Sequence, residues 1–192
     1  MTLVVGLLAL NDDRRPGGFI ATEIAVLDDS GTDPVFQIAA PLDGERWRGI
    51  VIHHLGAPAG DAESIHRQHL GFGWDGLGYH FLIGNGFGLG DGVVHVGYRW
   101  DRQYPGVHAT GPYADELNRH TIGICLIGNG DNREFTDRQI SHLSTLVQRL
   151  QNALDIPADR VFLHRQVASG LTSPGRHFPA ARFAAGLLDA PR

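Results

Sequence analysis

The sequence is poor in two features that would each have indicated a class of protein. It contains one cysteine, Cys125, which excludes an internal disulfide framework and a cysteine-rich zinc finger. Its formal net charge is −5 and it has no basic run, so it lacks the electrostatic surface that binds a phosphate backbone. Nucleic acid is therefore not an expected partner.

A hydrophobic run long enough to cross a membrane is also absent. The apolar stretch near the N-terminus, residues 3–10, is far shorter than the roughly 20 residues that span a bilayer. It also lacks the basic region and the small-residue cleavage site of a signal peptide. We predict no transmembrane segment and interpret this stretch as a β-strand or the stump of a removed anchor.

The length and composition indicate one folded domain. A chain of 192 residues with 42% hydrophobic content can bury one substantial core, and we expect a monomer. Regular secondary-structure signals begin only near residue 46. We therefore interpret residues 1–45 as an N-terminal extension packed on the domain, and residues 46–192 as the domain itself.

Short apolar runs alternate with segments of helical periodicity in the second part of the chain. The runs predict buried strands over residues 48–54, 78–84, 120–128 and 161–163. Helices are predicted after Asp61, over 136–154 and over 180–188. We expect an α/β fold, a single domain with a central mixed β-sheet flanked by helices on its faces.

Two further local patterns support this assignment. Thr136 and Gln139 have the spacing of a capping box, and apolar residues then recur on one helical face. The glycine-rich segment 84–92 follows a strand but does not match the G-x-G-x-x-G fingerprint that opens a helix. It predicts a hairpin-like loop and no dinucleotide site.

Histidine is abundant, with 11 residues, and two of these histidines end predicted strands. His53 follows one buried run and His164 follows another. Ligands gather at the carboxyl ends of strands in an open α/β sheet, so we expect the two to converge. In the alternative interpretation, each histidine only hydrogen-bonds a neighbouring loop. Because strand residues alternate faces, His53 and His54 cannot both enter one site.

Five blocks of sequence, in order, carry a family resemblance: "IVIHH", "IHRQHLGFGWDGLGYHFLIGNG", "GVHATG", "TIGICLIGN" and "LHRQV" with "SPGRHFP". Together they cover about residues 47–183. The chain resembles the type 2 N-acetylmuramoyl-L-alanine amidases, a family that includes phage amidases and the peptidoglycan recognition proteins.

The resemblance implies a zinc hydrolase that cuts the amide between N-acetylmuramic acid and L-alanine in peptidoglycan. On the family pattern His53 and His164 are zinc ligands, the third ligand position falls on Ser173, and Tyr79 is the catalytic residue beside the metal. A hydrolytic zinc needs three protein ligands and one open position, where bound water is acidified. Tyr79 would hydrogen-bond the developing oxyanion.

Five other residues are implied to contact substrate: His69, Trp74, Arg99, His108 and Thr172. The resemblance places the two other histidines and the tryptophan around the groove that receives sugar and peptide. Each has a structural alternative, since a tryptophan can belong to the core and a histidine can cap a helix or fix a loop.

The third ligand position departs from the family pattern. A neutral serine hydroxyl offers neither the charge nor the basicity of cysteine or aspartate, the residues that the resemblance implies at this position. Ser173 also lies nine residues after His164, a spacing that matches neither the cysteine-bearing nor the aspartate-bearing members. A replacement ligand could come from His177, a few residues further on, or from a water molecule held by Ser173.

Two other positions differ from the pattern. The family tends to place lysine or threonine two residues before the third ligand, and here that residue is Leu171, with Thr172 one residue later. Cys125 occupies the place where some of these amidases carry a glutamate base. We interpret Cys125 as a buried small hydrophobe.

The leading hypothesis from sequence is a zinc-dependent cell-wall amidase that binds peptidoglycan or muropeptide fragments. The alternative is a catalytically impaired peptidoglycan-binding protein of the same fold, because serine replaces the third zinc ligand. The substrate implies a cell-envelope or secreted location. A third possibility, an unrelated α/β domain, would require five ordered matches to be accidental.

Overall fold

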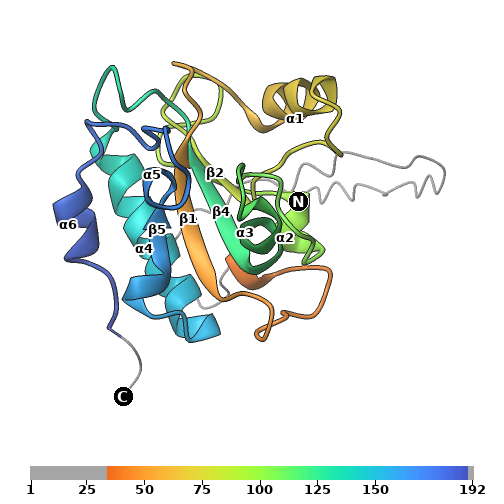
Figure 1. The fold of residues 1–192 in the computed structure, drawn as a ribbon. Coiled ribbons are helices and arrows are strands. Elements are labelled where there is room, and N and C mark those ends of the chain that lie inside the picture. Colours follow the sequence, from red (N-terminus) through yellow and green to blue (C-terminus); the bar gives the residue numbers. More distant parts are fainter. Residues whose placement is uncertain (1–33, 190–192) are drawn as a thin grey trace, which may run out of the picture.

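A five-stranded mixed sheet forms the centre of the chain (Figure 1). The structure is a computed structural model that describes residues 34–189. The strands follow the order β3-β2-β4-β1-β5, with β3 antiparallel to its neighbour and the other pairs parallel. Their bounds are β1 Gly49–His54, β2 Phe81–Ile83, β3 Val94–Val96, β4 Thr121–Leu126 and β5 Val161–Leu163. The predicted α/β class and mixed sheet are confirmed.

The two faces of the sheet are covered by different elements, because successive strand residues alternate direction. Ile50 and Ile52 of β1 belong to the main apolar core, together with the buried side of helix α4, Asp137–Leu154. Cys125 of β4 faces the other way and packs with helix α1, Ala62–Gly71. His53 pairs in register with Cys125, and its ring contacts lie on this second side.

Helix α4 has the boundaries that its sequence predicts. Thr136 accepts a hydrogen bond from the backbone of Gln139, and the Gln139 side chain accepts one from the backbone of Thr136, which completes the capping box. The apolar residues at helical spacing form its buried face: Ile140, Leu143, Leu146, Val147, Leu150 and Leu154. Asp61 caps α1 in the same manner.

The remaining helices are short. They are η1 Pro34–Phe36, α2 Tyr98–Asp101, α3 Ala114–His120, η2 Ala158–Arg160, α5 His164–Val167 and α6 Ala180–Ala184. The last predicted helix is therefore shorter than expected. Sequence reasoning missed α3, which has no buried residue and so no apolar periodicity, and the three-residue strand β3. The predicted hairpin-like loop is confirmed, since it joins β2 to the antiparallel β3.

The segment before β1 packs on helix α2. Trp100 donates its indole N–H to the carbonyl of Val35 at 2.6 Å, and Ala40 donates its backbone N–H to Asp101. The strand predicted over residues 3–10 lies outside the described residues. The division at residue 45 therefore stays a prediction.

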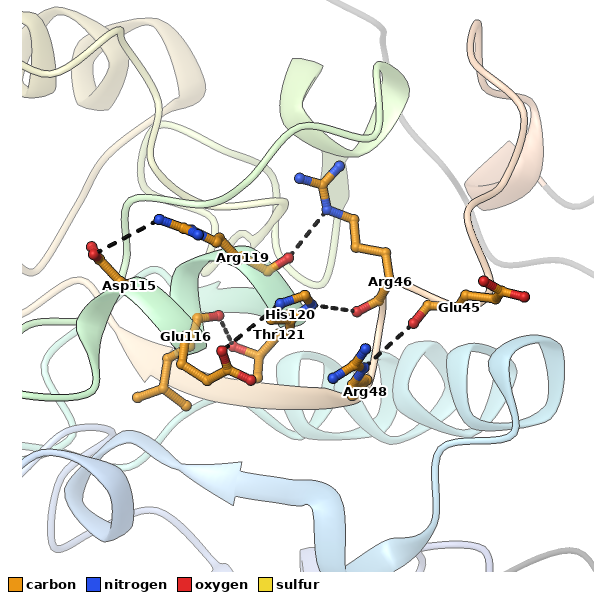
Figure 2. A network of polar contacts seen from close by, with 9 residues as sticks. Glu45, Arg46, Arg48, Asp115, Glu116, Arg119, His120 and Thr121 are labelled. Atoms are coloured by element: carbon orange, nitrogen blue, oxygen red, sulfur yellow. Dashed lines mark hydrogen bonds and ion pairs between the residues drawn. The ribbon is translucent and has the colours of Figure 1, made fainter.

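A polar network fixes the N-terminal ends of β1 and β4 (Figure 2). This end of the sheet is opposite to the end where His53 lies. Arg46 donates its Nε hydrogen to the carbonyl of Arg119 at 3.1 Å, and His120 bonds the carbonyl of Arg46 at 3.1 Å. These bonds tie the chain entering β1 to the C-terminal end of α3. The two strands therefore begin at a common level.

No helix within residues 34–189 is long and apolar enough to cross a bilayer.

Gln139 offers a test of this packing, because it joins α4 to the sheet. Its Nε2 group donates to the carbonyls of Ile83 and Ile127, and the side chain is 1% exposed. We expect Gln139→Leu to lower the free energy of unfolding by about 2 kcal/mol, because it removes both of these hydrogen bonds and part of the cap. Urea unfolding measures the change. Arg138→Ala, at the exposed neighbouring position, should change it by less than about 0.5 kcal/mol; equal stability of the two variants would refute this role for Gln139.

Candidate functional site

The two strand-end histidines lie side by side at the carboxyl end of the sheet. β1 and β5 pair in parallel with Ile52 opposite Leu163, so His53 and His164 leave their strands at the same level. Their ring centroids are 4.2 Å apart, which confirms the predicted convergence. Burial lowers the pKa of both imidazoles below the usual value. Both are therefore neutral near pH 7 and able to accept a hydrogen bond or bind a metal.

His54 points away from this pair. Its Nδ1 atom accepts a hydrogen bond from the backbone of Gly130 at 3.0 Å. His53 instead contacts the rings of Tyr79 and His164. The expectation that only one of the two adjacent histidines enters the site is confirmed.

Ser173 lies between the chain segments that carry the two histidines. Its Oγ atom accepts a hydrogen bond from the backbone N–H of His54 at 3.0 Å. Its carbonyl accepts one from the backbone N–H of Arg165 at 2.8 Å. The side chain is 9% exposed. Ser173 thus sits beside both histidines, at the position where the resemblance places a third ligand.

A tight turn holds Ser173 in place. Gly175 donates its backbone N–H to the carbonyl of Thr172 at 2.7 Å and has a φ of 101°, in the region that favours glycine. A Cβ atom at Gly175 would lie 2.1 Å from the backbone carbon of Gly130. Gly175 is therefore required by close backbone packing.

Tyr79 lies next to His53, with ring centroids 5.4 Å apart. Its hydroxyl shares a hydrogen bond with the thiol of Cys125, and burial raises the pKa of Tyr79 well above its usual value. Tyr79 is therefore protonated at neutral pH and able to donate a hydrogen bond. Burial also raises the pKa of the Cys125 thiol, which excludes this group as a thiolate base or nucleophile near pH 7.

Trp74 and His69 extend the site beyond Tyr79. The ring centroid of His69 lies 4.7 Å from that of Trp74 and 5.7 Å from that of Tyr79. His69 is also buried and accepts a hydrogen bond from the backbone of Gly78 at 3.0 Å. It therefore fixes the chain that leads into Tyr79, and its predicted contact with substrate stays a prediction.

Arg99 and His108 lie deeper than the resemblance suggested. Arg99 is 6% exposed and donates its Nε hydrogen to the carbonyl of Leu77 at 2.7 Å, which fixes the loop before Tyr79. His108 is also 6% exposed and lies 3.2 Å from His53, between their ring nitrogens. Both residues support the site from behind. A direct contact of either with substrate stays a prediction.

Thr172 remains at the surface beside the site. Its hydroxyl donates to the carboxylate of Asp131 at 2.6 Å, and this bond is the main reason that the pKa of Asp131 is lowered. Together with Arg165 and Arg176, these residues line an open depression of about 550 Å³. The predicted contact of Thr172 with substrate stays a prediction.

The described residues supply only part of a zinc site. His53 and His164 offer two neutral imidazoles, and the Nε2 atom of His164 is buried without a hydrogen-bond partner. No group of three His, Cys, Asp or Glu side chains within residues 34–189 is arranged to hold a metal ion. The third member is the Ser173 hydroxyl, which already accepts the His54 N–H. These residues do not form the full ligand set of a hydrolytic zinc.

The family described as N-acetylmuramoyl-L-alanine amidase matches residues 43–176. The chain belongs to this family. It is 32% identical over 117 residues to peptidoglycan-recognition protein SC1a of Drosophila melanogaster, a match that covers 60% of this chain and 56% of that protein. It is 34% identical over 91 residues to the endolysin of Escherichia phage T7, covering 45% of this chain and 52% of the endolysin. The chain thus spans about half the length of these relatives.

Solved structures of the same fold include a protein named as an amidase and a protein named as a recognition protein. The N-acetylmuramoyl-L-alanine amidase LysC from Clostridium intestinale superposes with a TM-score of 0.63 at 28% identity, covering 78% of this chain and 91% of LysC. Bumblebee PGRP-SA superposes with a TM-score of 0.57 at 28% identity, covering 71% and 80% of the two chains. The fold therefore accommodates proteins named as amidases and proteins named for recognition.

The buried histidines predict how stability depends on pH. Burial lowers the pKa of His69, His95 and His108 to about 4, from 6.5 in the unfolded chain. Between these values the unfolded state binds more protons, so stability falls as the pH drops from 6.5 toward 4. We expect the urea midpoint to decrease over this range and His95→Gln to make the decrease shallower. An unchanged midpoint between pH 6.5 and 4 would contradict the assignment.

Proposed function

We propose that this chain binds peptidoglycan fragments at the site formed by His53, Tyr79 and His164, and that Ser173 deprives it of the hydrolytic activity of its family. The observation that carries the proposal is the position of Ser173. Its hydroxyl accepts the backbone N–H of His54, the neighbour of His53, and its carbonyl accepts the backbone N–H of Arg165, the neighbour of His164. The turn that carries the third ligand position is therefore intact, but the side chain at that position is the neutral hydroxyl of Ser173.

The chemistry of serine supports this choice. Catalytic zinc is held by three protein ligands drawn from histidine, cysteine and carboxylates. Disturbing only an outer partner of a zinc ligand already costs about 10–100-fold in affinity or activity, so replacing an anionic ligand by a hydroxyl costs more. Two histidines and a hydrogen-bonded serine therefore hold zinc weakly, and no catalytic step follows from them.

The same residues suit the binding of an amide-rich ligand. The imidazoles of His53 and His164 are neutral acceptors, and the protonated Tyr79 hydroxyl is a donor. Trp74 and the exposed Phe72 add an aromatic surface, with ring centroids 5.5 Å apart. Sugar and peptide portions of a muropeptide offer matching amide, hydroxyl and apolar groups.

The comparisons supply independent support. Among the similar solved structures is the ectodomain complex of the peptidoglycan recognition proteins LCa and LCx with bound tracheal cytotoxin, at 28% identity and a TM-score of 0.55. PGRP-SC1a and bumblebee PGRP-SA also carry recognition names. A peptidoglycan ligand places the proposed site of action at the cell envelope or outside the cell.

Zinc-dependent hydrolysis of the N-acetylmuramoyl-L-alanine amide is the second candidate function. The observation that favours it is the buried Nε2 atom of His164, which has no hydrogen-bond partner. An unpaired buried polar atom costs about 1–3 kcal/mol, and a bound metal ion would remove that cost. Zinc would supply an acidified water and a polarised carbonyl, with His53 and His164 as its holders.

Binding without metal is the first test of the proposed function. Muramyl dipeptide contains the lactyl–L-alanine amide, and we expect chelator-treated wild-type protein to bind it. His53→Leu should bind at least about tenfold more weakly, because it removes a buried acceptor. Isothermal titration calorimetry measures both affinities. The control is His142→Gln in α4, a histidine outside the proposed site whose ring bonds the carbonyl of Gly92. Binding that appears only after zinc is added would refute the proposal.

Replacing Ser173 separates the two candidate functions. We expect Ser173→Cys to bind zinc at least about tenfold more tightly than the wild type, because a thiolate adds charge and basicity. Zinc per chain after mild chelation, and release of L-alanyl peptide, are measured together. Ser173→Ala is the matched control and should resemble the wild type. Measurable release by the wild type, at a rate equal to that of Ser173→Cys, would establish the amidase instead.

A further inference from the structure

The ring of His108 occupies a slot that two glycines leave open. A Cβ atom at Gly123 of β4 would lie 2.5 Å from the His108 ring, and a Cβ atom at Gly106 would lie 2.3 Å from it. Contacts this short do not occur, so any larger residue at either position would displace the imidazole. The slot holds His108 directly behind His53, with ring centroids 5.1 Å apart.

The hydrogen-bond partners of His108 determine which of its nitrogens carries the proton. Its Nε2 atom lies 3.2 Å from the carbonyl oxygen of Thr121. A carbonyl only accepts, so Nε2 carries the hydrogen. Its Nδ1 atom lies 3.2 Å from Nε2 of His53. In a neutral ring whose Nε2 atom carries the hydrogen, the Nδ1 atom is an acceptor.

An acceptor at Nδ1 of His108 dictates the tautomer of His53. The Nε2 atom of His53 must donate into this bond, so its hydrogen points into the protein. The lone pair of the neutral ring then lies on Nδ1. Within the described residues no hydrogen bond engages that atom, and the other close rings are those of Tyr79 and His164.

We propose that His108 is a positioning residue that locks His53 in its Nε2–H tautomer and leaves Nδ1 of His53 as the acceptor presented to the ligand. The relay runs from the Thr121 carbonyl through His108 to His53, and the two glycines make room for it. Its consequence for binding rests on the proposed function. In the complex with a peptidoglycan fragment, Nδ1 of His53 accepts a hydrogen bond from an amide N–H of the stem peptide.

The tautomer is measured by nitrogen-15 NMR of the histidine side chains in the full chain without ligand. The signals of His53 are identified by their loss in His53→Leu. We expect a protonated Nε2 and an unprotonated Nδ1 in the wild type. His108→Asn should keep this pattern, since its amide oxygen replaces the acceptor, whereas His108→Leu should give a mixture of tautomers. Gly123→Ala should give the same mixture although His108 is still present.

Muramyl dipeptide affinity is the second readout. We expect His108→Leu to bind about tenfold more weakly and His108→Asn to stay within about threefold of the wild type. His95→Gln, a buried histidine outside this relay, should keep both the tautomer and the affinity. Urea unfolding of each variant identifies any that fails to fold, and Gly123→Ala then serves in place of His108→Leu.

Two results would overturn the inference. One is a wild-type His53 protonated on Nδ1, and the other is an unchanged His53 tautomer in both His108→Leu and Gly123→Ala. Absence of muramyl dipeptide binding by the wild type would count against the proposed function alone, because the NMR measurement needs no ligand. The two proposals therefore fail separately.

Discussion

The parallel pairing of β1 with β5 is the constraint on which the site depends. Because Ile52 lies opposite Leu163, the residues that follow leave the sheet at one level, and two imidazoles from distant parts of the chain meet. The turn that carries Ser173 is then tied to β1 through the backbone of His54, and to helix α5, which directly follows β5, through the backbone of Arg165. A shift of register by one residue would turn His53 toward the opposite face and dissolve the site.

Under the proposed function, this scaffold separates binding from catalysis. The groups that shape the site are held by backbone hydrogen bonds and close packing, which do not depend on a metal ion. Catalysis in the family requires in addition that the third ligand be basic. Ser173 satisfies the first requirement and not the second, because its hydroxyl accepts a backbone hydrogen bond but carries no charge. Ser173→Cys restores the missing property at one atom.

The sequence predicted the parts of the fold that have strong local patterns. The capping box at Thr136 and the apolar face after it defined α4, and the strand-end positions of His53 and His164 predicted their convergence. The helix α3 was missed because it has no buried residue and so no apolar repeat, and the strand β3 was missed because it is only three residues long. Their places are set by tertiary pairing.

The depth of individual side chains could not be read from the motifs. The resemblance grouped His108 and Arg99 with substrate contacts, whereas both are buried and bond other parts of the protein. The slot for His108 depends on Gly123, a glycine within the strand β4. A glycine in an apolar strand indicates that another group approaches closely, but the sequence alone does not identify that group as His108.

The central claim is that a muropeptide binds at the paired histidines without zinc. Backbone amide spectra of the chelator-treated chain, recorded as muramyl dipeptide is added, test it most directly. We expect shifts concentrated at the ends of β1 and β5, around Tyr79 and in the turn that contains Ser173. Shifts centred on another surface, or no shifts until zinc is supplied, would contradict it.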